Sequence, residues 1–421
     1  MRNWLKRLVY RRITSLKRRD AARLSAQRKR QARGARRQFL YFHRFGDPAS
    51  VLMPGPVRAL AERFDADIVC HLVGLPEAAV VPEPDQLDAF ALADSARLAQ
   101  RLGLDVPSLA TPPTAERVAA AEAAAAESLG GPDALERIAA IDAALWSGGD
   151  LPPGGIGAAA ARQAGEALRD RLGHFQSATL WYEGEWYWAA DRLHHLEARL
   201  IGETGDAGLT PQIPVLHESS RTGDCGGARL TFFPSLRSPY TYLAAERVFA
   251  LARRWNVEVD IHFVLPMVMR SLPVPRRKGV YFLKDCAREA QRLGLPFGDI
   301  SDPLGRPTER GLAVLHRAIG QGKGEAFLLS FLRGAWSEGL DGGSDRGLRI
   351  MAERAGLDRT DVDAALADES WRAVAERHRT ELAGLGLWGV PSYRVGDCAV
   401  WGQDRLWVVE DALQHMAEHS T

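Results

Sequence analysis

The sequence predicts an α/β protein with two consecutive domains of the same architecture. Its 421 residues suffice for two or three domains of ordinary size, and 46% of them are hydrophobic. Residues 40–104 align without a gap on residues 231–295, so that Pro48 pairs with Pro239 and His71 with His262. The two copies also share one order of strand-like and helix-like segments. A repeat of this length indicates duplicated domains, because solenoid repeats recur every few tens of residues.

Residues 1–37 form a basic arm that we expect to be helical. They contain 15 Lys or Arg and a single acid, Asp20, for a net charge of +14, so the remaining 384 residues carry −13. Such a block is typical of a solvated segment that binds a negative partner. Its apolar residues fall on about half of a helical wheel, which suits an anionic membrane surface. An acidic protein partner, RNA and no specific role remain open, with nucleic acid the less favoured partner.

The arm has no uninterrupted apolar core of the kind a signal peptide needs, and no apolar run reaches the length of a spanning helix. We therefore expect the protein in the cytoplasm, either free or bound peripherally to a membrane.

Composition sets the domain boundaries. The stretch 204–226 is rich in Gly, Pro, Ser, Thr and Asp, which is typical of an interdomain linker. The first domain is predicted at 38–203 and the second at 227–418.

The second domain shows the order strand, helix, strand, long helical region, hairpin, helix. The segments are 228–233, 238–255, 257–265, 279–378, 392–400 with Gly396-Asp397 at its turn, and 410–418. A βαβ unit followed by a ββα unit is the plan of a thioredoxin fold with an inserted helical subdomain. The first domain repeats it with a shorter insertion.

Three motifs of the second domain carry a family resemblance. They are FFPSLRSPYTYLAAER at 232–247, GVYFLKDCAREAQRLGLPF at 279–297 and WGVPSYRVGDCAVWGQDRL at 388–406. Together they resemble the 2-hydroxychromene-2-carboxylate isomerases and kappa-class glutathione transferases, which belong to the DsbA-like thioredoxin superfamily. The segment 267–277 departs from the isomerases, because it lacks their Gly-Asn.

The resemblance implies that glutathione is the cofactor and that Ser238, at the start of the first helix, lies beside its sulfur. A hydroxyl donor and the positive end of a helix both favour a thiolate. Ser238 is therefore the candidate catalytic residue. It is also a good helix N-cap with Pro239 at the first helical position, and the two roles are compatible.

Two further elements are implied to bind glutathione. Val390-Pro391 resembles the superfamily's cis-proline loop, in which the residue before proline pairs its backbone with an extended peptide; the alternative is an ordinary turn that starts a strand. Gln403 and Asp404, before the last helix, would contact the γ-glutamyl carboxylate and ammonium, respectively. Alternatively, Asp404 caps the helix and Arg405 forms a surface ion pair.

The first domain provides an internal comparison, because it lacks these site residues. Asp47 stands opposite Ser238, Ala178 opposite Pro391 and Ala190 opposite Gln403. Since a carboxylate repels a thiolate, we expect the first copy to be degenerate. By contrast Trp146 and Trp336 occur in both copies, so we expect them in the cores.

Cysteine and histidine usage argues against two other chemistries. The four cysteines include no Cys-x-x-Cys pair, which disfavours a dithiol oxidoreductase. The 11 histidines form no ligand pattern with carboxylates or cysteines, so no metal site is predicted.

The resemblance implies a glutathione-dependent isomerase or transferase, in which a thiolate adds to a small aromatic or conjugated substrate. The alternative is a non-catalytic DsbA-like scaffold or binding protein docked through its basic arm. The two domains would form either a monomeric pseudo-dimer or part of a homodimer.

Overall fold

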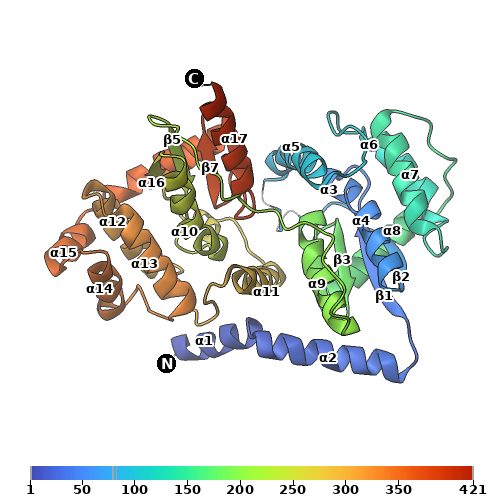
Figure 1. The fold of residues 1–421 in the computed structure, drawn as a ribbon, viewed down its shortest axis with the longest axis horizontal. Helices are drawn as coiled ribbons and strands as arrows, with labels where there is room; N and C mark the ends of the chain where they lie inside the picture. Colours follow the sequence, from blue (N-terminus) through green and yellow to red (C-terminus); the bar gives the residue numbers. More distant parts are fainter. Residues whose placement is uncertain (1, 78–79, 82, 420–421) are drawn as a thin grey trace. The chain divides into compact units, whose positions relative to one another are not determined.

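The computed structural model describes residues 2–77, 80–81 and 83–419 (Figure 1). The chain folds into two compact units. The C-terminal unit comprises Met1–Leu16 and Leu216–Thr421, and the N-terminal unit comprises Lys17–Val215. The predicted arm is thus divided between the units at residue 16.

The C-terminal unit is built on a four-stranded sheet of order β6-β5-β7-β8. Strand β5 pairs in parallel with β6 and antiparallel with β7, and β7 and β8 form a hairpin. The strands are β5 (Arg229–Phe233), β6 (Glu258–Ile261), β7 (Ser392–Val395) and β8 (Cys398–Trp401).

The N-terminal unit has the same topology, with the order β2-β1-β3-β4 and the same strand directions. Its strands are β1 (Arg37–His43), β2 (Ala66–Leu72), β3 (Thr179–Tyr182) and β4 (Glu185–Trp188). The predicted fold class, two DsbA-like thioredoxin folds with helical insertions, is confirmed.

Helix α10 connects β5 to β6, a helical insertion separates β6 from β7, and α17 closes the C-terminal unit (Figure 1). The helices are α10 (Pro239–Arg254), η2 (Met267–Arg270), α11 (Arg276–Leu293), α12 (Arg306–Gly320), α13 (Gly324–Ser337), α14 (Asp345–Arg354), α15 (Arg359–Ala367), α16 (Trp371–Gly384) and α17 (Leu406–His419). Helix α11 begins three residues before the predicted helical region, and α17 begins four residues before the predicted final helix.

The N-terminal unit carries a smaller insertion, from α5 to α8. Its helices are α3 (Pro48–Val51), α4 (Pro54–Arg63), α5 (Pro84–Leu102), α6 (Ala115–Ala126), α7 (Ala134–Ser147), α8 (Ala158–Arg171), η1 (Ala190–Arg192) and α9 (Leu193–Thr204).

Aromatic side chains fill the core of the C-terminal unit. The fully buried rings of Phe232 and Tyr393 stack across β5 and β7 with their centroids 5.7 Å apart. Trp336 is buried against Phe297, and its Nε1 donates to the carbonyl of Leu236. Burial of such rings is the main term that stabilises a domain of this size.

The basic arm is helical, as α1 (Arg2–Ile13) and α2 (Leu16–Ala32). Several of its arginines form ion pairs with the chain's own acids. On α2, Arg23 contacts Glu185, and Arg30 contacts Glu183 and Glu203. These arginines of the predicted solvated arm are therefore already paired within the fold.

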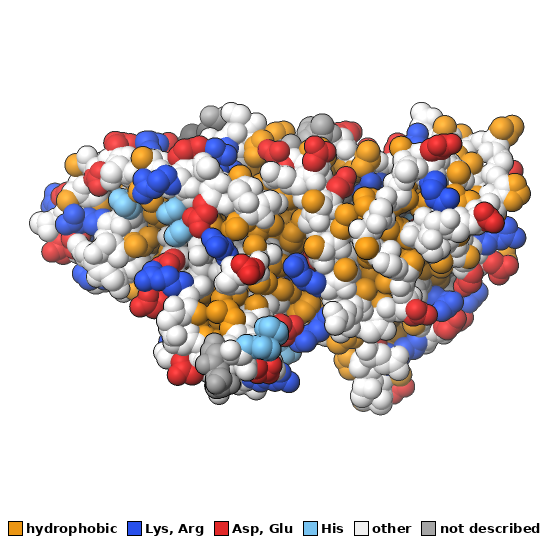
Figure 2. Space-filling view, turned by 90° about the horizontal axis from the view of Figure 1, so that it is seen from above, with side chains coloured by type: hydrophobic (Ala, Val, Ile, Leu, Met, Phe, Trp, Pro, Cys, Tyr) orange, Lys and Arg blue, Asp and Glu red, His pale blue; other side chains and the backbone are white. Residues whose placement is uncertain are grey.

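No helix in the described part of the chain is both long and apolar enough to cross a membrane. On the face shown in Figure 2, acidic and basic side chains are interspersed among apolar ones. The negative charge that balances the arm is therefore not gathered into one acidic patch on that face.

Candidate functional site

Ser238 is the N-cap of α10. Its backbone is extended, with φ −95° and ψ 115°, and the Thr241 N–H donates to its Oγ over 3.1 Å. Pro239 follows at the first helical position, where its missing N–H costs nothing and its fixed φ suits the helix. The capping role predicted for Ser238 is confirmed, and this role places its hydroxyl at the positive end of the helix.

The loop before β7 lies against Ser238. The Val390–Pro391 peptide bond is cis, as the resemblance implies. The Ser238 hydroxyl donates to the Val390 carbonyl oxygen over 3.4 Å, longer than an ordinary O–H···O bond and therefore weak. Among the described residues, the Val390 N–H has no acceptor. The fold thus joins two predicted site elements that lie 152 positions apart.

Gly389 is needed where this loop meets the hairpin. A Cβ at this position would lie only 2.2 Å from Cε2 of Trp401, whose ring also packs on Trp388 with centroids 4.9 Å apart. The loop is further linked to the end of β8, because the Gly402 N–H donates to the Pro391 carbonyl over 2.9 Å. The segment that carries Gln403 and Asp404 therefore begins directly beside the cis-proline.

The Gln403 side chain is buried and bonded at both ends. Its Oε1 accepts from Arg247 over 3.2 Å, and its Nε2 donates to Glu289 over 3.1 Å. Arg247 in turn is bonded to both carboxylate oxygens of Glu218. Both ends of the Gln403 amide are therefore already hydrogen-bonded within the protein. Contact between Gln403 and a γ-glutamyl carboxylate stays a prediction, and it would have to use the backbone N–H of Gln403.

Asp404 lies in the same turn, and its Oδ1 is 3.0 Å from Nη1 of Arg405. Both side chains are mostly buried, with exposed fractions of 16% and 8%. The ion pair of Arg405 that the sequence offered as the alternative is therefore present, but it is mostly buried and not at the surface. A role for Asp404 in binding an ammonium group stays a prediction.

Sequence reasoning did not single out three neighbours of Ser238. The Thr241 Oγ1 accepts a hydrogen bond from the Ser235 N–H over 3.3 Å, which connects the first turn of α10 to the loop after β5. The buried Ser235 hydroxyl has no partner among the described residues, which leaves a polar atom free for a ligand or a water molecule. The Tyr240 hydroxyl donates to Asp285 over 2.9 Å. The spacing Ser-x-x-Thr after β5 was the available signal, since the third residue after a cap supplies the bonded N–H.

In the N-terminal unit, the residue that corresponds to Ser238 is Asp47, and its carboxylate is buried and hydrogen-bonded. The Asp47 carboxylate accepts from the hydroxyls of Ser50 and Ser177 over 2.8 and 2.7 Å, and from the Ala49 N–H over 3.3 Å. Asp47 is 5% exposed. The Ala189 N–H donates to the Ala178 carbonyl over 2.8 Å, just as Gly402 donates to Pro391. The first copy thus keeps this backbone hydrogen bond, and its Asp47 carboxylate is occupied by hydrogen bonds from within the same unit.

The cysteines offer no dithiol. All four are free thiols, and Cys70, Cys225 and Cys286 are buried. Burial raises the pKa of Cys70 to about 12 and also raises that of Cys225, so these thiols stay protonated near neutral pH.

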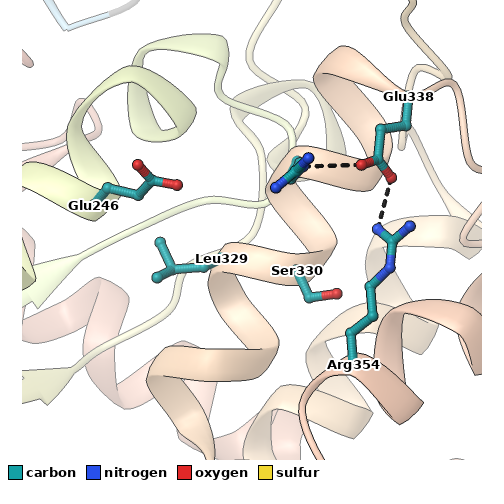
Figure 3. Close-up of a pocket in the computed structure, with 6 residues that line it drawn as sticks. Glu246, Leu329, Ser330, Glu338 and Arg354 are labelled. Atoms are coloured by element: carbon teal, nitrogen blue, oxygen red, sulfur yellow. Dashed lines mark hydrogen bonds and ion pairs between the residues drawn. The ribbon is translucent and has the colours of Figure 1, made fainter. Parts of the chain in front are cut away.

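One surface pocket of the C-terminal unit, of about 350 Å³, lies elsewhere (Figure 3). There Glu338 accepts from both Arg333 and Arg354, while Glu246 approaches from α10. Glu246 follows Ser238 by eight residues, which is about 12 Å along a helix. The pocket is therefore separate from the candidate site.

Comparisons with known proteins relate the second domain to a known family. Residues 229–414 match the model of the DsbA-like thioredoxin domain. The 2-hydroxychromene-2-carboxylate isomerase of Sphingobium xenophagum is 25% identical over 200 residues, covering 44% of this chain and 97% of that protein. The isomerase of the same name from Pseudomonas putida is 24% identical over 205 residues, covering 45% and 96%.

Two solved structures are similar to the C-terminal half. A 2-hydroxychromene-2-carboxylate isomerase shares 20% identity, covers 46% of this chain and 97% of its own, and gives a TM-score of 0.40. The cytosolic disulfide reductase DsbM from Pseudomonas aeruginosa with GSH shares 21%, covers 46% and 98%, and gives 0.37. By the match to the family model, residues 229–414 form a DsbA-like thioredoxin domain, and this half of the chain is similar in sequence to 2-hydroxychromene-2-carboxylate isomerases.

Proposed function

We propose that the C-terminal unit is a glutathione-dependent isomerase or transferase of the 2-hydroxychromene-2-carboxylate isomerase type, acting on a small aromatic or conjugated substrate. The observation that carries the proposal is the position of the Ser238 hydroxyl, at the N-terminus of α10 and 3.4 Å from the carbonyl of the cis-proline loop. The two isomerases similar in sequence to this domain support the reaction class.

The residues present fit glutathione in part. The weakly bonded Ser238 hydroxyl, the Val390 N–H and the unpartnered Ser235 hydroxyl gather at one end of the sheet, where an extended peptide could bind. The Gln403 amide does not fit its predicted role, because Arg247 and Glu289 hold it. Bound glutathione would supply a thiolate nucleophile for a conjugated carbon of the substrate.

Each residue has a definite task in this proposal. The Thr241 N–H already donates to Ser238 Oγ, so the hydroxyl proton is free to turn from the Val390 carbonyl toward a neighbouring anion. The positive end of α10 favours negative charge at the same point, by about 0.3–1 kcal/mol. Val390 would hold the peptide backbone, and Asp404 would attract its ammonium group.

Calorimetric titration of glutathione into the full chain tests the proposal, with the ultraviolet absorbance of the thiolate followed in parallel. We expect millimolar or tighter binding and a lowered thiol pKa in the bound peptide. An absence of heat at millimolar glutathione would sink the enzyme hypothesis and favour the non-catalytic scaffold. Binding with an unshifted thiol pKa would remove Ser238 alone from its catalytic role.

A further inference from the structure

Helix α1 is fixed on the C-terminal unit by two arginines, and it lies beside α11 (Figure 1). Arg7 donates to both carboxylate oxygens of Asp299, over 2.8 Å each, and Arg11 donates to the same carboxylate over 2.7 Å. Burial alone raises the pKa of Asp299, but hydrogen bonds from Arg11 and Arg7 outweigh it and hold that pKa low. The carboxylate therefore stays charged and anchors the helix.

The rest of the inward face of α1 is polar as well. The Tyr10 hydroxyl donates to Asp302 over 3.1 Å, and burial next to that carboxylate raises the pKa of Tyr10 to about 12. Thr14 is buried against Gly298, and a Cβ added to Gly298 would lie only 2.6 Å from Oγ1 of Thr14. These contacts determine which side of the helix faces the protein.

The outward side of α1 carries large apolar residues, where an ordinary surface helix is polar. Its four large apolar residues each leave about half of the side chain exposed: Trp4 53%, Leu5 52%, Leu8 48% and Val9 52%. At about 100° per residue they span an arc of roughly 140°, which also contains Arg12, whereas Arg7, Tyr10 and Thr14 lie outside it. A stripe of this kind is costly to leave in water and marks a binding surface.

Positive charge lies both within and beside this stripe, because Arg12 falls inside the apolar arc and Lys6 falls outside it. Lys6 and Arg12 are exposed on α1, and Arg11 remains 54% exposed beside its partner Asp299. Helix α1 itself therefore contributes cations and apolar side chains to this face but no carboxylate. Two copies of such a face would repel each other, whereas an anionic surface with an apolar interior complements both features.

We infer that the outward face of α1, formed by Trp4, Leu5, Leu8 and Val9 with Lys6 and Arg12, docks the protein on an anionic lipid surface. The apolar side chains enter the boundary between headgroups and acyl chains, and the cations contact the phosphates. With 12 residues, the helix lies in the interface rather than across the bilayer. The glutathione chemistry proposed above is not required for this docking.

Sedimentation of the full chain with vesicles of phosphatidylglycerol and phosphatidylcholine tests the inference. We expect binding that weakens in pure phosphatidylcholine and with rising salt. Leu8→Glu should lower the partition coefficient at least roughly tenfold, because it removes an inserted side chain and adds an anion. The matched control Leu75→Glu makes the same exchange at a 68% exposed site of the N-terminal unit and should leave binding unchanged.

A second pair of variants, Lys6→Gln and Arg12→Gln, removes one charge each and keeps all four apolar side chains. Each should weaken binding by roughly fivefold, the value of one cation near an anionic surface. Failure to bind anionic vesicles, or equal binding by wild type and Leu8→Glu, would overturn the inference. So would a concentration-dependent dimer in sedimentation velocity that Leu8→Glu abolishes, since it would make a second copy the occupant of this face.

Discussion

The Ser238 hydroxyl lies 3.4 Å from the carbonyl oxygen of Val390, although 152 positions separate the two residues. The N-terminal unit has a corresponding but different contact, in which the Ser177 hydroxyl donates to Asp47 over 2.7 Å. A weak contact to a carbonyl leaves the Ser238 hydroxyl available, whereas the short bond to a carboxylate fills the site. The two units thus share an architecture and differ in the hydrogen bonds made at this position.

Ser238→Ala should lower the free energy of unfolding by about 1 kcal/mol, because the Thr241 N–H loses its cap. It should also weaken glutathione binding and restore the ordinary thiol pKa of the bound peptide. Ser344→Ala is the matched control, since Ser344 caps α14 through the Gly347 N–H over 3.0 Å. The control should lose similar stability by chemical denaturation and keep glutathione binding. Equal binding by the two variants would contradict a catalytic role for Ser238.

Gly389→Ala should destabilise the protein by about 1–3 kcal/mol, because its Cβ would overlap the Trp401 ring. Relief of this overlap has to move the Val390–Pro391 loop, so glutathione binding should weaken as well. Gly384→Ala places its Cβ in open space at the end of α16 and serves as the control. Thermal unfolding should show a loss for the first variant only; equal melting temperatures would refute the steric argument.

Glu218→Gln should cost about 2–3 kcal/mol, because Arg247 then keeps a mostly buried charge with no carboxylate. Burial raises the pKa of Glu218, but bonds from Arg247 outweigh it and lower that pKa below the ordinary 4.5. This stabilisation is therefore complete above pH 4.5 and is lost as the pH falls through the folded-state pKa. Urea unfolding at several pH values should show the difference between variant and wild type shrinking in acid.

The exposed pair of Arg253 and Glu325 provides the control for that experiment. Its partners are 2.7 Å apart, but their side chains are 64% and 41% exposed. Glu325→Gln should therefore change the free energy of unfolding by less than about 1 kcal/mol. Losses of the same size in both variants would show that burial of the Glu218 pair contributes nothing.

His378 should make the protein less stable in mild acid. Burial and the neighbouring His262, whose ring stacks on it at 4.2 Å, lower the pKa of His378 from 6.5 to about 4. A group whose pKa is lowered in the folded state stabilises fully above pH 6.5, and this contribution is lost as the pH falls toward 4. His378→Phe keeps a ring and cannot be protonated, so its stability should fall less steeply between these values. An unchanged slope in denaturant titrations would assign the effect to other groups.

The parts of the fold that depend on near neighbours could be predicted from the sequence. Helix α10 begins where Ser238-Pro239 provides a cap and a suitable first residue, and the hairpin β7–β8 turns at Gly396 with φ 53°. The shared order of elements then predicted the same topology in both units. The start of α17 was predicted too late, because Leu406 to Val409 are apolar on all sides and show no helical period.

The sequence could predict which residues form the candidate site but not the contacts that their side chains make. That Gln403 would be buried between Arg247 and Glu289 could not be predicted, since these partners lie 156 and 114 positions away. The orphaned Ser235 hydroxyl has no sequence signal either, because burial and missing partners are properties of the packed state.

The sequence by itself predicted the two-domain architecture, the capped start of α10 and the absence of the candidate site residues from the first copy, because periodicity, caps and self-comparison require no knowledge of distant contacts. The tertiary structure decided which polar groups are already satisfied. It paired Arg7 and Arg11 with Asp299, so the first helix of the basic arm is bound to the C-terminal unit and leaves its large apolar residues outward. It also placed two hydroxyl groups in hydrogen bonds to the Asp47 carboxylate, whereas the Ser238 hydroxyl makes only a weak bond to a carbonyl oxygen. The physical reason is that a charge or hydroxyl acquires its partner only when folding brings distant segments within about 3 Å.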